Sequence, residues 1–339
     1  MQFRTLGSTG IRVSALAFGA GPVPALMTSD NNQCQRDTLR RALDAGVNWI
    51  DTAATYGNGQ SEAGLGRALS DLSALDDVHI ATKVRLAAED LDDIEAKVRE
   101  SVESSFKRLG VSRITLLQLH NSITACRGDE PTSVSPDDVL GVDGVLSAFL
   151  ELRDEGVIDH IGLTAIGQAE SLREVINTGQ FATIQVPYNL LNPSAGEPSA
   201  GESVSAEFTE VDYGNVIEDC ARQNMGVFAI RVFAGGALAG QPPSRHTYKT
   251  EFFPLDLYRR DQQRREQLSD LLGPPADLRE IALRFVLSHA HISSVIIGFG
   301  DSSHIDDALA YLGAGPLPAE TLHKIASSNF RTVTSSTPR

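Results

Sequence analysis

Apolar runs of strand length alternate with amphipathic segments of helix length along almost the whole chain. We predict eight strands, at residues 15–18, 48–51, 78–83, 114–120, 160–164, 183–187, 226–231 and 294–298. We predict helices at about residues 32–44, 61–70, 91–109, 136–155, 168–178, 212–223, 277–289 and 303–312. Strands that alternate with helices in this way form a parallel sheet covered by helices.

Eight strand–helix units favour a closed (β/α)8 TIM barrel over an open sheet. The 339 residues are enough for one such barrel, and we expect a single domain spanning residues 1–339. The alternative, a doubly wound sheet, carries a GxGxxG loop after its first strand, but the first predicted strand is followed by FGAGPVPAL. The pattern therefore predicts an α/β barrel.

Four segments lie outside the repeated units. Residues 1–14 are predicted to form an N-terminal β-hairpin that caps the bottom of the barrel. The connections 189–212 and 234–276 follow strands, so we expect long loops on the C-terminal face, where barrel enzymes place their active sites. Residues 313–339 form a C-terminal segment.

The charge and composition exclude several classes of protein. A formal net charge of −15 opposes general binding to nucleic acid or to anionic membranes. No run approaches 18 apolar residues and the N-terminus does not resemble a signal peptide, so we expect a cytoplasmic protein without a membrane segment. The three cysteines and eight histidines show no metal-site spacing, and we expect no metal.

Ionisable side chains end three consecutive predicted strands. Asp51 ends the second strand, Lys83 the third and His120 the fourth, while Tyr56 follows Asp51 on the loop. Each residue alone could be a turn cap or a loop-facing side chain. Because the carboxyl ends of barrel strands meet at one mouth, the four together predict a catalytic site.

The chemistry of these four residues is coherent. A tyrosine with its ordinary pKa near 10 exchanges a proton poorly at neutral pH unless a cation stabilises the phenolate. Lys83 can supply that cation, Asp51 can hold Lys83 in place, and His120 can share a hydrogen bond with a substrate oxygen. Hydride transfer needs such a group to protonate a carbonyl or deprotonate an alcohol.

In the contexts GVNWIDTAATYG, IATKV and LLQLH, these residues resemble the aldo-keto reductase family, and the likeness covers most of the chain. The resemblance implies a (β/α)8 barrel that is an NAD(P)-dependent oxidoreductase. It further implies that Tyr56 is the general acid/base, that Lys83 and Asp51 tune it, and that His120 positions the carbonyl.

The resemblance also implies contacts with the nicotinamide. The family's Ser-Asn pair after the fifth strand is replaced here by Thr164-Ala165, and Gln185 matches the family glutamine that contacts the carboxamide. Arg231 stands near the family's aromatic position after the seventh strand. Its planar guanidinium can stack on the cofactor or bind substrate oxygens.

The last strand and its helix, SVIIGFGDSSHIDDAL, resemble the family's phosphate-binding segment. The candidate cofactor contacts there are Gly298, Gly300, Asp301, Ser302, His304 and Asp307. The arginine of many NADPH-preferring members is replaced by a glycine next to a carboxylate, which would repel a 2′-phosphate but accept hydrogen bonds from a ribose. The cofactor is therefore NAD(H) or NADP(H), with the residues favouring NAD(H).

The leading hypothesis is an oxidoreductase for a small polar carbonyl or alcohol, such as a sugar, similar to the bacterial aldose dehydrogenase-like branch of the family. One alternative is a non-catalytic, cofactor-binding regulatory subunit of the same fold. Another is an unrelated barrel lyase that uses Lys83 as a Schiff base. The sequence specifies neither the substrate, nor the direction of reaction, nor the oligomeric state.

Overall fold

The computed structural model describes residues 1–197 and 211–327. Parallel strands close into a barrel in the order β10-β3-β4-β5-β6-β7-β8-β9. These strands are β3 (Leu16–Gly19), β4 (Trp49–Asp51), β5 (His79–Val84), β6 (Ile114–Leu119), β7 (Ile158–Thr164), β8 (Thr183–Pro187), β9 (Gly226–Ile230) and β10 (Ile292–Gly298). The pairing of β10 with both β3 and β9 closes the ring, which confirms the predicted (β/α)8 fold.

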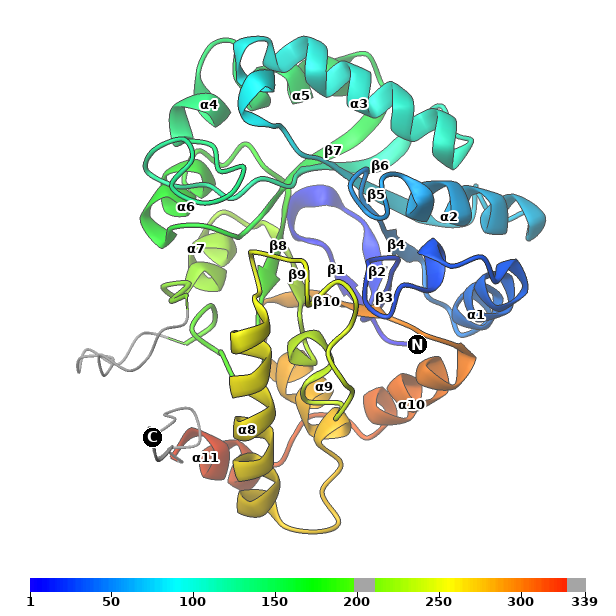
Figure 1. Ribbon diagram of the computed structural model, residues 1–339, viewed down its shortest axis with the longest axis vertical. Helices are drawn as coiled ribbons and strands as arrows, with labels where there is room; N and C mark the ends of the chain where they lie inside the picture. The colour runs from blue at the N-terminus through cyan, green and yellow to red at the C-terminus, as the bar shows by residue number, and fades with distance from the viewer. Residues whose placement is uncertain (198–210, 328–339) are drawn as a thin grey trace.

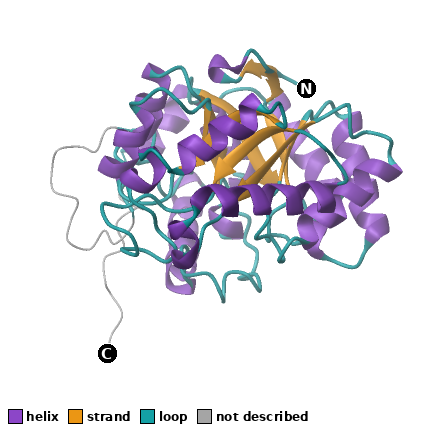
Figure 2. Cartoon of the chain, turned by 90° about the horizontal axis from the view of Figure 1, so that it is seen from above, coloured by secondary structure: helices purple, strands orange, loops and turns teal. Residues whose placement is uncertain are grey.

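Helices surround the barrel, as the view from above shows (Figure 2). They are α1 (Asn32–Asp44), α2 (Gln60–Asp71), α3 (Ile94–Leu109), α4 (Pro136–Leu140), α5 (Val145–Asp154), α6 (Ala169–Ile176), α7 (Val216–Arg222), α8 (Leu255–Leu272), α9 (Leu278–Ser288), α10 (Ser302–Gly313) and α11 (Ala319–Ala326). Their apolar faces pack on the outer side of the strands in one large hydrophobic cluster. The inner side of the strands is left to line the barrel.

One predicted helix is two helices in the structure. The segment predicted as helical at residues 136–155 divides into α4 and α5 around Gly141 and Gly144. A Cβ atom at Gly141 would lie 2.6 Å from the carbonyl oxygen of Asp137, and one at Gly144 would lie 2.7 Å from that of Asp138. The chain therefore folds back on itself here more closely than a continuous helix allows, and the prediction of a single helix is wrong.

The connection predicted as a loop at 234–276 contains α8 (yellow in Figure 1), a helix of 18 residues. Its buried residues, Tyr258, Asp261, Arg264 and Leu268, follow helical spacing, but two of them are charged. An apolar pattern therefore does not reveal the helix. In the C-terminal segment 313–339, α11 is likewise helical, and residues 328–339 lie outside the described residues, as do 198–210 of the other long connection.

The predicted N-terminal hairpin is present as antiparallel β1 (Phe3–Thr5) and β2 (Arg12–Ser14). Leu6, between them, is fully buried, and its side chain approaches so closely that a Cβ atom at Gly226 would lie 2.5 Å from it. The Arg4 guanidinium donates hydrogen bonds to the carbonyl oxygens of Leu287 and Ile292, at 2.8 and 2.7 Å. The hairpin is thereby fixed to the last strand of the barrel.

Leu6 belongs to a separate hydrophobic cluster inside the barrel, which we call the barrel floor. The floor consists of Leu6, Val13, Ala17, Trp49, Ala81, Leu116 and Phe228. The rings of Trp49 and Phe228 lie 4.8 Å apart between centroids, so aromatic side chains fill the width of the barrel at this level. The open end of the barrel is therefore the one formed by the carboxyl ends of the strands.

Candidate active site

Asp51 and Lys83 form a buried ion pair at the carboxyl ends of β4 and β5. The Lys83 Nζ lies 2.6 Å from Asp51 Oδ2, with the two side chains 0% and 4% exposed, and it also donates to the Thr52 carbonyl oxygen at 2.8 Å. Burial alone disfavours the charged amine, but the neighbouring Asp51 carboxylate and Tyr56 raise the pKa of Lys83 above its ordinary value of 10.5. Lys83 is therefore a cation at neutral pH.

Two amide side chains hold the other oxygen of Asp51. Gln185, from β8, donates a hydrogen bond from Nε2 to Asp51 Oδ1, and Gln118 Nε2, from β6, lies 3.4 Å from the same oxygen. Four strands of the barrel therefore contribute to the position of one carboxylate. The resemblance assigns Gln185 to the cofactor, and the structure gives its amide nitrogen this additional partner.

Tyr56 is carried over the ion pair by the loop between β4 and α2. Its hydroxyl oxygen lies 3.4 Å from Lys83 Nζ, and the ammonium group is 4.9 Å from the centroid of the tyrosine ring. Gly57 and Gly59 follow with φ of +58° and +87°, values that other residues rarely adopt. These two glycines let the chain turn at once into α2, which keeps the phenol above the lysine.

His120 follows β6 and completes the group. Its ring meets the Tyr56 ring edge to face, with 5.6 Å between centroids and an angle of 81°, and its Nδ1 lies 3.3 Å from Thr55 Oγ1. Burial, with the charges of Arg85 and Lys83, holds the pKa of His120 well below its ordinary value of 6.5. At neutral pH the imidazole is therefore uncharged and can donate one hydrogen bond to a substrate oxygen.

A cavity of about 720 Å³ opens over this group. Asp51, Tyr56 and His120 line it, and so do six of the nine sequence-predicted cofactor residues, namely Thr164, Gln185, Arg231, Gly298, His304 and Asp307. The other three, Gly300, Asp301 and Ser302, are not among its lining residues. Asp301 instead caps α10 by accepting a hydrogen bond from the Ser303 N–H at 2.8 Å, and the Gly300 N–H donates to His304 Nδ1 at 3.1 Å.

Two features of the cavity wall fit a nicotinamide dinucleotide. Thr164 Oγ1 is buried and has no hydrogen-bond partner among the described residues, so a bound carboxamide would satisfy it. A Cβ atom at Gly298 would lie 2.1 Å from the carbonyl oxygen of Val23, so only glycine lets β10 approach the loop after β3 this closely. Among the residues that the resemblance assigns to the cofactor, the candidates that line this cavity and would hold it are Thr164, Gln185, Gly298, His304 and Asp307.

The structure adds lining residues that the sequence patterns did not single out. Arg85, two residues beyond Lys83, lines the cavity, as do Phe252 and Phe253 from the connection before α8. Arg279 lines the far end, where its Nη1 is 3.0 Å from Asp307 Oδ2. Extending the search two residues past each strand end would have found Arg85, whereas the other three follow no strand.

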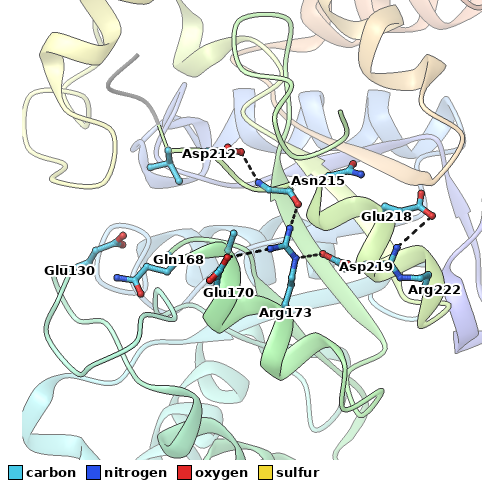
Figure 3. A pocket seen from close by; sticks show the side chains of 13 residues that line it. Glu130, Gln168, Glu170, Arg173, Asp212, Asn215, Glu218, Asp219 and Arg222 are labelled. Atoms are coloured by element: carbon cyan, nitrogen blue, oxygen red, sulfur yellow. Dashed lines mark hydrogen bonds and ion pairs between the residues drawn. The ribbon is translucent and has the colours of Figure 1, made fainter. Parts of the chain in front are cut away.

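A second hollow of about 940 Å³ lies between α6 and α7, outside the barrel (Figure 3). It shares no lining residue with the first cavity. Its central side chain, Arg173, pairs with Asp219 at 2.8 Å and also donates to the Gly214 carbonyl oxygen. Because its basic groups are engaged by neighbouring carboxylates, we place the chemistry in the first cavity.

The described part of the chain contains neither a candidate metal cluster nor a helix that could span a membrane. In residues 1–197 and 211–327, no three His, Cys, Asp or Glu side chains are grouped so as to hold a metal ion. The three cysteines, Cys34, Cys126 and Cys220, are free thiols. None of the described helices has the length and apolar character needed to cross a membrane.

The closed barrel and the polar cluster at the carboxyl ends of its strands define a (β/α)8 barrel enzyme. The model of the Aldo/keto reductase family matches residues 15–329, and the chain belongs to this family. Membership implies an NAD(P)-dependent oxidoreductase and confirms the resemblance seen in the sequence.

Individual relatives agree with this assignment. The chain is 30% identical to "Aldo-keto reductase YhdN" of Bacillus subtilis over 64% of this chain and 62% of that protein, so the match spans under two thirds of that relative. It is 26% identical to "D-threo-aldose 1-dehydrogenase" of a Pseudomonas species over 95% and 96% of the two chains. It is 24% identical to "L-galactose dehydrogenase" of Arabidopsis thaliana over 91% and 88%. The solved holo form of aldo-keto reductase AKR11C1 from Bacillus halodurans shares the fold, with a TM-score of 0.70, 22% identity and coverage of 96% and 95%.

Proposed function

We propose that the protein interconverts the carbonyl and alcohol forms of a small polar substrate, such as a sugar, with Tyr56 as the general acid/base. The observation that carries this proposal is a series of contacts that runs from Asp51 to Lys83, at 2.6 Å, and from Lys83 to the Tyr56 hydroxyl, at 3.4 Å. This series of contacts ends at Tyr56, which lines the cavity, where a substrate oxygen can reach the phenol. Its two ionic members are held at the bottom, out of solvent.

Each residue has a distinct task in this mechanism. A bound nicotinamide would supply or accept the hydride. Lys83, kept cationic by Asp51, lies 3.4 Å from the Tyr56 hydroxyl, and the phenol can release its proton to a carbonyl oxygen there. In the reverse direction the phenolate accepts the proton of an alcohol. His120, uncharged, donates a hydrogen bond that positions the same oxygen and stabilises negative charge on it.

The named activities of two relatives support a sugar-like substrate. Both "D-threo-aldose 1-dehydrogenase" and "L-galactose dehydrogenase" are similar to this chain over most of its length. Both names describe oxidation of a sugar. With NAD as the cofactor, which cells keep mostly oxidised, we propose oxidation of the alcohol as the working direction.

The charges at the far end of the cavity support NAD(H) over NADP(H). Arg279 is the cation there, but it lies 3.0 Å from both the Asp277 and the Asp307 carboxylates. One guanidinium between two carboxylates leaves a net negative charge, which repels a 2′-phosphate and suits a ribose hydroxyl. Titration with NADH and NADPH side by side tests this preference, and tighter binding of NADPH would contradict it.

Replacing one hydroxyl group tests the mechanism. Tyr56→Phe removes the proton donor but keeps the ring, so we expect a loss of at least about 100-fold in kcat with NADH affinity nearly unchanged. Tyr248→Phe is the matched control, because Tyr248 is 64% exposed and does not line the cavity. Retained turnover in Tyr56→Phe would remove Tyr56 from the role of acid/base.

The same experiments separate the alternatives. Binding of NADH without turnover in a panel of sugars and aldehydes would favour the non-catalytic regulatory subunit. A Schiff-base lyase requires a neutral, accessible amine. The Lys83 side chain is 0% exposed and its pKa is raised, so the structure disfavours that reaction.

A further inference from the structure

Two arginines that line the cavity are stacked on two consecutive phenylalanines. The guanidinium carbon of Arg85, beyond β5, lies 4.9 Å from the centroid of the Phe252 ring. That of Arg231, beyond β9, lies 3.7 Å from the centroid of the Phe253 ring. Stacking engages the flat face of a guanidinium and leaves its N–H edge free for other partners.

The N–H groups of Arg231 make no direct contact with a carboxylate among the described residues. Within residues 1–197 and 211–327, the Arg231 guanidinium forms no hydrogen bond or ion pair. The charge of the Asp261 carboxylate acts on Arg231, where it opposes the lowering of the arginine pKa by burial. Asp261 also lies 3.8 Å from Arg264, and burial raises the pKa of Asp261 to about 7. Arg231 also has a φ of +57°, a strained value for a residue with a side chain, and such strain concentrates at functional sites.

Only part of the hydrogen-bonding capacity of Arg85 is used as well. Its Nη2 lies 3.3 Å from the carbonyl oxygen of His120, but its Nε is buried without a partner among the described residues. His246 lines the same cavity as both arginines, and burial, followed by the charges of Arg231 and Arg85, lowers the pKa of its imidazole. The two guanidinium groups therefore face one region of the cavity.

This region is positively charged in a strongly acidic protein. Three cations, Arg85, Arg231 and Lys249, line it, against the carboxylate of Glu251 in the lining and that of Asp261, whose charge acts on Arg231. The chain as a whole carries a formal charge of −15. Cations placed together with unsatisfied donors, in a protein of the opposite overall charge, mark a place where an anion binds.

We propose that the substrate carries an anionic oxygen group, a carboxylate or a phosphate, which Arg231 and Arg85 bind while Tyr56 and His120 contact the carbonyl. This inference rests on the proposed function and narrows its substrate class. A guanidinium binds a carboxylate through two parallel hydrogen bonds, which fixes direction as well as distance. The substrate would then be held by its anionic group at the two arginines, with its carbonyl at Tyr56 and His120.

The test compares pairs of substrates of similar shape in which one member carries a carboxylate and the other is neutral. The first pair is para-carboxybenzaldehyde and its neutral amide, para-formylbenzamide, and the second is D-glucuronate and D-glucose. We expect kcat/KM to favour the anionic member of a pair by roughly 10- to 100-fold, the range for a charge-assisted contact. Arg231→Gln should lower this ratio by about tenfold and Arg231→Lys by less. Arg245→Gln, on an exposed residue of the same connection that does not line the cavity, should keep it.

A binding measurement makes the inference independent of turnover. Calorimetric titration of the NAD-loaded protein should show tighter binding of benzoate than of benzamide, and Arg231→Gln should remove the difference. Equal kcat/KM for the members of both pairs would overturn the inference while leaving the oxidoreductase proposal intact. Binding of benzoate without turnover of any carbonyl would support the anion site and refute the reaction. If Arg231→Gln raises the dissociation constant for NADH and leaves the substrate ratio unchanged, the guanidinium binds the pyrophosphate of the cofactor. That outcome would overturn the inference.

Discussion

Asp51→Asn removes the negative charge next to Lys83 while keeping the shape of the side chain. In the native protein the 2.6 Å contact and the burial of both side chains make this pair the main support of the lysine charge. Removing one member of a buried ion pair costs about 3–5 kcal/mol, because the other charge is left without a partner. The asparagine can still accept from Gln185, and the Thr52 carbonyl still accepts from Lys83, so we expect about 3 kcal/mol.

The pH dependence of this loss is more diagnostic than its size. In the native protein the pKa of Lys83 is raised, so the pair stabilises the fold below pH 10.5 and the contribution disappears as the pH rises through the folded-state pKa. Without Asp51, burial dominates and lowers the pKa of Lys83. The unfolded chain then binds more protons than the folded one, and the stability of the variant should rise with pH towards 10.5.

Urea unfolding at several pH values between about 7 and 10 measures both effects. Asp138→Asn is the matched control, because Asp138 is also a buried carboxylate, 4% exposed, but its partner Arg127 has a side chain that is 56% exposed. The control should lose only about 1 kcal/mol, and its stability should not rise in that pH range. A loss below about 1 kcal/mol in Asp51→Asn, or a slope equal to that of the native protein, would refute the reasoning.

Two further predictions concern the cavity wall and the imidazole. Gly298→Ala places a Cβ atom 2.1 Å from the Val23 carbonyl oxygen, so we expect the affinity for NADH to fall at least about tenfold. Fluorescence titration measures this affinity. Gly313→Ala is the control and should not change it, because a Cβ atom there meets nothing within 4 Å. Because the pKa of His120 is depressed when folded, the unfolded state binds more protons below pH 6.5, and the free energy of unfolding should fall as the pH drops from there. His120→Gln should flatten that slope relative to the native protein in acid titrations followed by circular dichroism, and an unchanged slope would show that His120 does not contribute to it.

The barrel could be predicted from the sequence because its strands are short, continuous apolar runs. The prediction for 183–187 coincides with β8, and the other strands differ by at most two residues at either end. The prediction from the sequence failed where the buried side chains are not apolar. In α8 the side chains of Asp261 and Arg264 are buried, which a hydrophobic pattern cannot show.

The candidate site likewise contains residues that could be predicted from the sequence and residues that could not. Asp51, Lys83 and His120 could be found because polar groups at the ends of apolar strands are conspicuous, and the structure brings them together. The placement of Phe252 and Phe253 depends on contacts with arginines far away in the sequence, which no local pattern records. Asp301 was assigned to the cofactor by resemblance alone, while its local role as the cap of α10 is a contact within its own turn.

The barrel floor makes the active site a blind-ended well. Leu6, Trp49 and Phe228 close the lower end with side chains that are fully buried, and none of them can relay a proton. A dinucleotide and a substrate would therefore enter from the carboxyl ends of the strands, where Arg85 and Arg231 line the cavity. In a well with one opening, the molecule that lies deeper enters first and leaves last, so the fold itself favours an ordered kinetic sequence in which release of the deeper molecule ends each turnover.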